Sequence, residues 1–201
     1  LVPETAWNDS TQNYFWEDVG VDPSGRPFIF SNGRLYKKTG SLWEYNSVPP
    51  VSGYYPTVLV ARDGKVHVFY HFLVSGGNYH LYHAECDPSL PSGASCPNAE
   101  NLVTRPASQP SNPLYGNATH NSAVEDVDGN LHVVYGYYYG YWGLFYTSRT
   151  ANGVWNAPIR VHPDVKGAVY RYFPAGERAP KTATAIDKVP QGSRDLVLVV
   201  P

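Results

Sequence analysis

Apolar and polar residues alternate along two long stretches of the chain, and an Asp-Gly pair interrupts each stretch. The first reads PTVLVARDGKVHVFYHF and then NYHLYHAE between residues 56 and 85. The second reads NSAVEDVDGNLHVVYGYY and then GLFYTSR between residues 121 and 149. Asp-Gly between alternating segments is the strongest short-range signal of a β-hairpin. Each stretch therefore predicts a strand, a tight turn, an alternating strand and a third strand.

The two stretches are copies of one sequence repeat. Aligned on the glycines of their Asp-Gly pairs, they match His67 with His132, Val68 with Val133, Tyr70 with Tyr135 and, one residue out of step, Tyr82 with Tyr146. Weaker copies occur as VGVDPSGRPFIF at residues 19–30 and ATAIDKVPQGSRDLVLVV at residues 183–200. A repeated sheet of antiparallel strands is typical of a β-propeller or a related repeat array.

The pattern predicts a nearly all-β chain, because 18 Gly and 18 Pro are spread along its 201 residues and no stretch shows helical spacing of apolar residues. We expect a single propeller domain over residues 1–201, or part of one, built from blades of about four antiparallel strands. The repeat units are predicted at roughly 14–48, 54–104, 119–163 and 179–201. The longer gaps between copies exceed the about 40 to 50 residues of a bare blade, so insertions are expected together on one face, where binding occurs.

The last repeat stops after its predicted second strand. Either a strand near residues 7–16 completes this blade and closes a small ring, or the chain is part of a larger ring that a partner chain completes. The sequence also contains no Met, from which we expect a mature or partial chain that has lost an N-terminal segment.

Composition narrows the classes of partner. Charged residues make up 16% of the chain and the net charge is −2, which argues against nucleic acid, since phosphate binding relies on clustered Lys and Arg. No apolar run reaches the about 18 to 20 residues of a membrane span. No cofactor is expected. No metal is expected either: DVDGN at residues 126–130 resembles half a calcium loop, but a hairpin turn explains it better. His80 and His83, three apart on a strand, fall on opposite faces.

Cys86 and Cys96 bracket a polar loop rich in Pro, Ser and Gly. Two interpretations stand: a disulfide formed in an oxidising compartment, or two free thiols, since the spacing is not that of a zinc site. Two Asn-x-Ser/Thr sequons, at Asn8 and Asn117, fit a glycoprotein. With the cysteines, they lead us to expect a secreted, extracellular protein.

The segment HNSAVEDVDGNLHVVYG, followed by LFYTSR and NGVWNAPIRV, resembles the blade phrase of the BNR/sialidase-like propeller superfamily. Within that superfamily it is most similar to propeller polysaccharide lyases that cleave ulvan-like acidic polysaccharides. The likeness covers roughly residues 50–200. It departs from these families at YGYYYG, where a second His often follows the core phrase; the first copy has His71 there. SRTANGVW is only a shortened relative of a sialidase Asp-box.

The resemblance implies an active centre of His, Asn, Tyr and Arg, for which the matching residues are His120, Asn121, Tyr138 or Tyr139, and Arg171. A neutral imidazole can take the C5 proton of a uronate, and a tyrosine can serve the glycosidic oxygen. An arginine would neutralise the carboxylate. We therefore predict catalysis by His120, Tyr139 and Arg171. The predicted substrate-binding residues are Asn121, Tyr55, Tyr138, Tyr141, Trp142, His71 and Arg178.

Each of these residues also has a structural explanation. The aromatics of YGYYYGYWGLFY pack between blades by default, and His120 can simply hydrogen bond at the start of a strand. His67 and His132 repeat at one register, which favours a structural role. The leading hypothesis is a polysaccharide lyase, and the alternatives are a propeller lectin or a structural module of a larger extracellular assembly. The aromatic run occurs in one copy only, which favours one site over a repeated lectin pocket.

Overall fold

The computed structural model describes residues 17–49, 54–74, 78–97, 99–102, 117–138, 142–162, 183–184 and 198–199. These residues form β-strands, turns and extended segments, and none of them belongs to a helix that could cross a membrane. Contacts divide the chain into two compact units, one of residues 1–72 with 82–100 and one of residues 73–81 with 101–201. The predicted all-β class is confirmed for this part of the chain.

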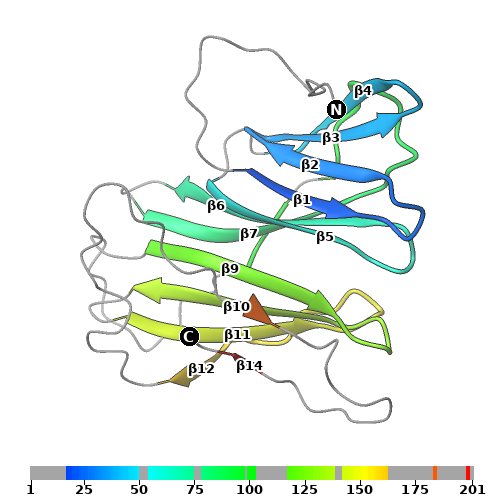
Figure 1. The fold of residues 1–201 in the computed structure, drawn as a ribbon. Helices are drawn as coiled ribbons and strands as arrows, with labels where there is room; N and C mark the ends of the chain where they lie inside the picture. Colours follow the sequence, from blue (N-terminus) through cyan, green and yellow to red (C-terminus); the bar gives the residue numbers. More distant parts are fainter. Residues whose placement is uncertain are drawn as a thin grey trace. The chain divides into compact units, whose positions relative to one another are not determined.

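The strands form three successive meanders of four, here called blades (Figure 1). The first blade contains β1 (Glu17–Val21), β2 (Pro27–Ser31), β3 (Arg34–Thr39) and β4 (Leu42–Ser47). The second contains β5 (Tyr54–Val60), β6 (Val66–Val74), β7 (Asn78–Cys86) and the short β8 (Glu100–Asn101). The third contains β9 (Asn117–Glu125), β10 (Leu131–Tyr138), β11 (Trp142–Arg149) and β12 (Ile159–His162). A last pair is formed by β13 (Ala183–Thr184) and β14 (Leu198–Val199).

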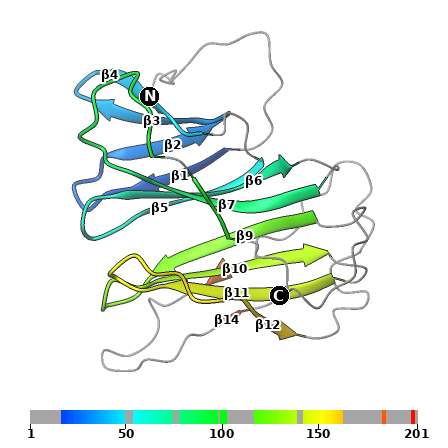
Figure 2. The ribbon, with the colours of Figure 1, turned by 180° about the vertical axis from the view of Figure 1, so that it is seen from behind.

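Strand order follows chain order within each blade, and the pairing is antiparallel where the register is defined, as in the third blade seen from behind (Figure 2). The predicted four-stranded antiparallel unit is therefore confirmed. One further link is parallel: Tyr79 of β7 pairs with Asn117 at the start of β9.

Among the described residues the same five-residue turn occurs four times, at residues 22–26, 61–65, 126–130 and 150–154. In each turn the first amide donates to the carbonyl of the fifth residue, and the glycine at the fourth position donates back to the carbonyl of the first. The glycine has a φ between 79° and 87°, a left-handed conformation that costs other residues strain. Three of the turns join the first and second strands of a blade, and the fourth joins β11 to β12.

The first unit has a continuous apolar core. Its buried side chains come from β2, β3, β5, β6 and β7, and the fully buried ones include Phe28, Phe30, Val66, Val68 and Tyr70. The first strands of the two blades, β1 and β5, lie side by side. Asp18 of β1 accepts a 2.8 Å hydrogen bond from the amide of Val58, and Gly20 lies directly against the same residue.

A disulfide joins Cys86 and Cys96 and closes the loop that follows β7. The loop returns to the first blade, where the amide of Cys96 donates to the carbonyl of Ser47 over 2.8 Å. The buried ammonium of Lys37 donates to the carbonyls of Pro88 and Leu90 in this loop. A buried charge needs such partners, so the loop and Lys37 stabilise each other.

We predict that Gly20→Ala destabilises the first unit. A Cβ at this position would lie 2.9 Å from Cγ1 of Val58 and 3.1 Å from its carbonyl oxygen, and the carbonyl belongs to the β5 backbone. Overpacking of this kind costs about 1 to 3 kcal/mol, which urea unfolding would measure. The matched control is Val19→Ala on the same strand, where the side chain is 56% exposed and the expected change is under about 0.5 kcal/mol. Equal midpoints for the two variants would contradict the close packing of β1 on β5.

Candidate functional site

The first strand of the second blade begins with a β-bulge. Tyr54 pairs with His71 and Thr57 pairs with Phe69, so Tyr55 and Pro56 together face one residue of β6. Tyr55 has a φ of 50°, which is uncommon for an aromatic residue and costs strain. Bulges redirect side chains and are frequent next to active sites.

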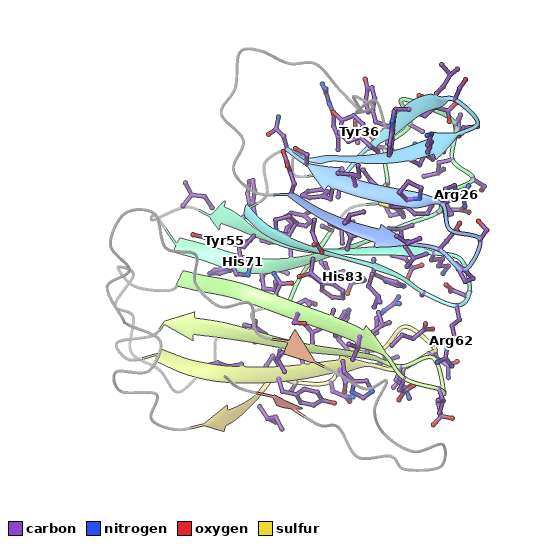
Figure 3. The ribbon with its side chains drawn as sticks, in the orientation of Figure 1. Arg26, Tyr36, Tyr55, Arg62, His71 and His83 are labelled. Carbon is purple, nitrogen blue, oxygen red and sulfur yellow. A yellow bond between two sulfur atoms is a disulfide. The ribbon has the colours of Figure 1, made fainter. Side chains whose placement is uncertain are left out.

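Tyr55 and His71 meet at this bulge. Their ring centroids are 5.8 Å apart with the planes tilted by 57°. His71 is fully buried, whereas Tyr55 is partly exposed. Figure 3 shows both at the end of the β5–β6 hairpin that lies away from Arg62 and its turn. The structure thus brings together two of the predicted substrate-binding residues.

The third blade has a bulge at the corresponding place. Tyr135 pairs with Asn121 and Gly136 pairs with Thr119, so His120 is the extra residue on β9. Tyr55 and His120 both precede the glycine of the following turn by nine residues. The position matched to His71 is Gly136, which has no side chain to cover the bulge. Glycine inside a strand often marks a place where a ligand approaches closely.

We call this end of each blade, where the first strand begins and the second ends, the open end. In the third blade it is the end at which β9 starts and β12 finishes. The chain leaves the described strands here at residue 162 and re-enters at residue 183. Long connections between strands commonly carry function. The segment after β12 thus leaves from the end that carries the bulge, whereas the Cys86–Cys96 loop leaves β7 at the turn end, where Glu85 contacts Lys65. The expectation that the insertions share one face is therefore wrong for the Cys loop.

The remaining predicted residues fall into three groups. Asn121 lies on β9 opposite Tyr135 and is partly buried. The structure describes the backbone of four others in strands β9, β10 and β11, namely Asn117, His120, Tyr138 and Trp142. Five lie outside the described residues: Asn8, Tyr139, Tyr141, Arg171 and Arg178.

Two buried histidines form a pair inside the second blade. Nδ1 of His67 lies 2.9 Å from Nε2 of His83, and the rings are stacked with centroids 5.2 Å apart. Both side chains are at most 2% exposed. On its far side His83 has Nδ1 3.9 Å from the carboxylate of Glu100, which is 54% exposed. Figure 3 shows His83 inside the sheet, further along the strands than Tyr55 and His71.

His132 occupies the corresponding place in the third blade. Its Nδ1 lies 2.8 Å from the hydroxyl of Tyr146, and its Nε2 lies 3.0 Å from Oδ2 of Asp126. These contacts place Tyr146 in correspondence with His83, not with Tyr82 as the sequence alignment suggested. Because each histidine is hydrogen bonded within its own blade, a structural role explains both.

Asp126 holds the turn together. Its Oδ1 accepts hydrogen bonds from the amides of Asp128 and Asn130, and its Oδ2 accepts from the side chains of Asn130 and His132. Partial burial raises the pKa of Asp126, but these hydrogen bonds outweigh it and lower the pKa to about 2. The DVDGN segment is thus a hydrogen-bonded hairpin turn. In the described part of the chain, His, Cys, Asp and Glu side chains form no group of three placed to hold a metal ion.

One polar pair was missed by the sequence reasoning. Nδ2 of Asn101 lies 2.9 Å from Nδ1 of His80, and burial lowers the pKa of His80. His80 was considered only as a metal ligand together with His83. His80 contacts Asn101 and His83 contacts His67, so these two histidines have different partners. No sequence signal links His80 to Asn101, because the chain connects them through the disulfide loop.

Comparison with known proteins gives a fold and no family. No protein-family model and no curated protein matches the chain. An endo-arabinase from Bacteroides thetaiotaomicron matches with a TM-score of 0.51 at 11% identity, over 78% of this chain and 66% of that one. An endo-1,4-beta-xylanase from the same organism matches with a TM-score of 0.47 at 11% identity, over 77% and 55%. An ulvan lyase matches with a TM-score of 0.41 at 18% identity, over 72% and 34%.

Identities this low show the fold alone. The chain spans about half to two thirds of the lengths of the xylanase and the arabinase. The endo-arabinase is a β-propeller enzyme, and its likeness agrees with the three four-stranded meanders. The predicted β-propeller fold, built of repeated antiparallel blades, is therefore confirmed.

We predict that the His67–His83 pair is a coupled structural unit. His67→Phe or His83→Phe alone removes the shared hydrogen bond from a buried site and is expected to cost about 1 to 3 kcal/mol. The double variant is expected to lie within about 1 kcal/mol of the unsubstituted protein, because two apolar rings need no partner. Phe28 already occupies the matching position of the first blade. Urea unfolding of all four proteins measures the coupling, and additive losses would contradict it.

We predict that Asp126 makes the protein sensitive to acid. Its folded pKa of about 2 lies below the ordinary value of 3.8, so its stabilising effect is complete above pH 3.8 and is lost as the pH falls toward 2. Asp126→Asn should be less stable at neutral pH and should lose less stability across this window. Asp128→Asn, at an exposed position of the same turn, is the control. Thermal unfolding across the window measures the slopes, and identical slopes for Asp126→Asn and the unsubstituted protein would contradict the assignment.

Proposed function

We propose that this protein is a secreted, carbohydrate-processing propeller of the BNR/sialidase-like superfamily that cleaves an acidic polysaccharide by β-elimination. The observation that carries the proposal is the repeated bulge, which puts His120 at the register where Tyr55 occupies a strained conformation. Bulges are frequent next to active sites, and backbone strain such as that of Tyr55 is typical of functional positions. The disulfide supports export to an oxidising compartment.

In this mechanism His120 takes the C5 proton of the uronate, and the electrons move toward its carboxylate. Arg171 neutralises the developing negative charge, and Arg178 is a second candidate for this role. The bond from C4 to the glycosidic oxygen then breaks, Tyr139 protonates the leaving oxygen, and the product is a 4,5-unsaturated uronate. Removal of one proton and return of another balance the reaction without a cofactor.

Binding would involve residues of the third blade near the bulge of β9. Asn121 follows His120 on β9, while Tyr138 and Trp142 end and begin the two strands that flank the aromatic loop. Tyr141 lies within that loop in the sequence. Aromatic rings suit the C–H faces of sugars and their hydroxyls provide polar contacts. Tyr55 and His71 form the corresponding aromatic group of the second blade.

The absence of a side chain at Gly136 favours a ligand site next to His120. In the second blade the matching position holds His71, whose ring packs against Tyr55 at the bulge. In the third blade no side chain occupies this position, because the residue is glycine. A sugar ring would therefore meet less obstruction at the bulge of β9 than at the bulge of β5. This difference favours one irregular site over the same pocket in each blade.

We predict that His120→Ala abolishes elimination. The unsubstituted protein, incubated with a panel of uronate-containing polysaccharides, should raise the ultraviolet absorbance of the unsaturated product. Loss of the base should slow this reaction by about 100-fold or more. The control is Val154→Ala, an exposed residue of the 150–154 turn at the opposite end of the third blade. Circular dichroism of each variant would show that the fold is retained.

The other outcomes identify the competing functions. A normal rate for folded His120→Ala would remove His120 from the mechanism. If no substrate reacts but an immobilised glycan array retains the protein, it is a lectin without chemistry. If it neither reacts nor binds, a structural or interaction module remains, and the carbohydrate proposal fails.

A further inference from the structure

The pair of His80 and Asn101 has a defined hydrogen-bond direction. Nδ2 of Asn101 lies 2.9 Å from Nδ1 of His80. An amide nitrogen can only donate, so Nδ1 of the imidazole must be the acceptor. The ring proton of the neutral histidine then lies on Nε2. Asn101 therefore selects one tautomer and orients an N–H donor.

His80 is also held in its neutral form. Burial lowers its pKa, because the charged imidazolium is less well solvated there. Protonation would add an N–H at Nδ1, which would face the N–H of Asn101. Burial and the contact with Asn101 both disfavour the protonated form of His80. At neutral pH the imidazole is an uncharged donor through Nε2.

The backbone around the pair is fixed by strand pairing. The amide of Leu102 donates to the carbonyl of Leu81 over 2.8 Å, which anchors the chain just after Asn101 beside β7. Asn101 is exposed and His80 is partly buried, so the pair lies at the surface of the sheet. His83, three residues further on the same strand, instead contacts His67 inside the blade. The two histidines of β7 therefore serve different purposes.

The pair lies beside the start of β9. Tyr79, the residue before His80, pairs in parallel with Asn117. From there β9 runs through Ala118 and Thr119 to the bulge at His120. His80, Asn101 and this part of β9 all belong to the second unit. The donor is thus placed next to the strand that leads into the proposed catalytic position.

We propose that His80, oriented by Asn101, is a binding residue that donates its Nε2–H to an oxygen of the saccharide bound at His120. A hydroxyl oxygen can accept this hydrogen bond, and a carboxylate oxygen accepts it more strongly. An uncharged donor selects for a correctly placed oxygen, because a buried polar group left unpaired costs affinity. The proposal rests on the proposed function and adds a residue that is absent from the predicted site.

The first experiment tests the tautomer without any ligand. Two-bond ¹H–¹⁵N correlation spectra of the histidine rings in the full chain, assigned with His80→Gln, should show His80 at neutral pH as the Nε2–H form. Asn101→Leu has a similar size but no donor, so the same ring should become a mixture of tautomers. A single Nδ1–H form in the unsubstituted protein would overturn the proposal.

The second experiment tests binding during turnover of the uronate polysaccharides. His80→Ala should raise KM by about tenfold, the worth of one hydrogen bond, with a smaller change in kcat. His80→Gln should restore part of the loss because its amide can donate, and Asn101→Leu should give an intermediate KM. Melting temperatures of the variants would separate these effects from unfolding.

The outcomes separate this inference from the function on which it rests. If the unsubstituted protein turns over the substrate and His80→Ala has the same KM, His80 does not bind the saccharide and the inference fails alone. If the unsubstituted protein neither turns over nor binds any saccharide, the proposed function fails and the binding role of His80 fails with it. A raised KM in His80→Ala that His80→Gln does not relieve would also contradict a hydrogen-bond donor.

Discussion

The hydrogen-bonded five-residue turn is the constraint on which the rest of the structure depends. Its two backbone hydrogen bonds close only when the glycine at the fourth position has a positive φ. Once closed, the turn fixes which residues of the two strands face each other. A slip of one residue would move every apolar side chain to the opposite face of the sheet. The turn therefore determines the core of each blade, and it also determines where the bulges fall.

The two ends of a blade differ because of this constraint. At the turn end, side chains such as Asp126 satisfy the backbone of their own hairpin. At the open end, the first strand has one residue more than its partner strand can pair. The extra residue forms a bulge, at Tyr55 in β5 and at His120 in β9. An extra residue occurs at this place in both blades, and Tyr55 holds a strained backbone conformation there. Backbone strain at such a position agrees with a role in binding or catalysis.

The sequence predicted the parts of the fold that depend on local signals. Alternation around Gly64 and Gly129 predicted the hairpins, because turn geometry and side-chain period are encoded by neighbouring residues. The bulges could not be predicted, because an extra residue in one strand becomes visible only when its partner strand is known. No residue type within YYPTVLV marks Tyr55 as the extra residue.

The hydrogen-bond partners of the side chains also could not be predicted from local sequence signals. His67 was expected to be structural, but its partner His83 lies on the next strand across a loop. The alignment matched Tyr146 to Tyr82, because the hairpin between His67 and His83 is two residues longer than the one between His132 and Tyr146. The contact between His80 and Asn101 crosses the disulfide loop in the same way. Two of the three predicted catalytic residues, Tyr139 and Arg171, lie outside the described residues, so their roles stay predictions.

The central claim is that the bulge of β9 is the place where the saccharide binds. The most direct measurement is a crystal structure of the protein with an intact acidic oligosaccharide bound. The account predicts density for the sugar at the open end of the third blade, with one ring next to His120 and Gly136. A sugar bound at the turn end, or the same sugar bound in equivalent pockets of every blade, would contradict it.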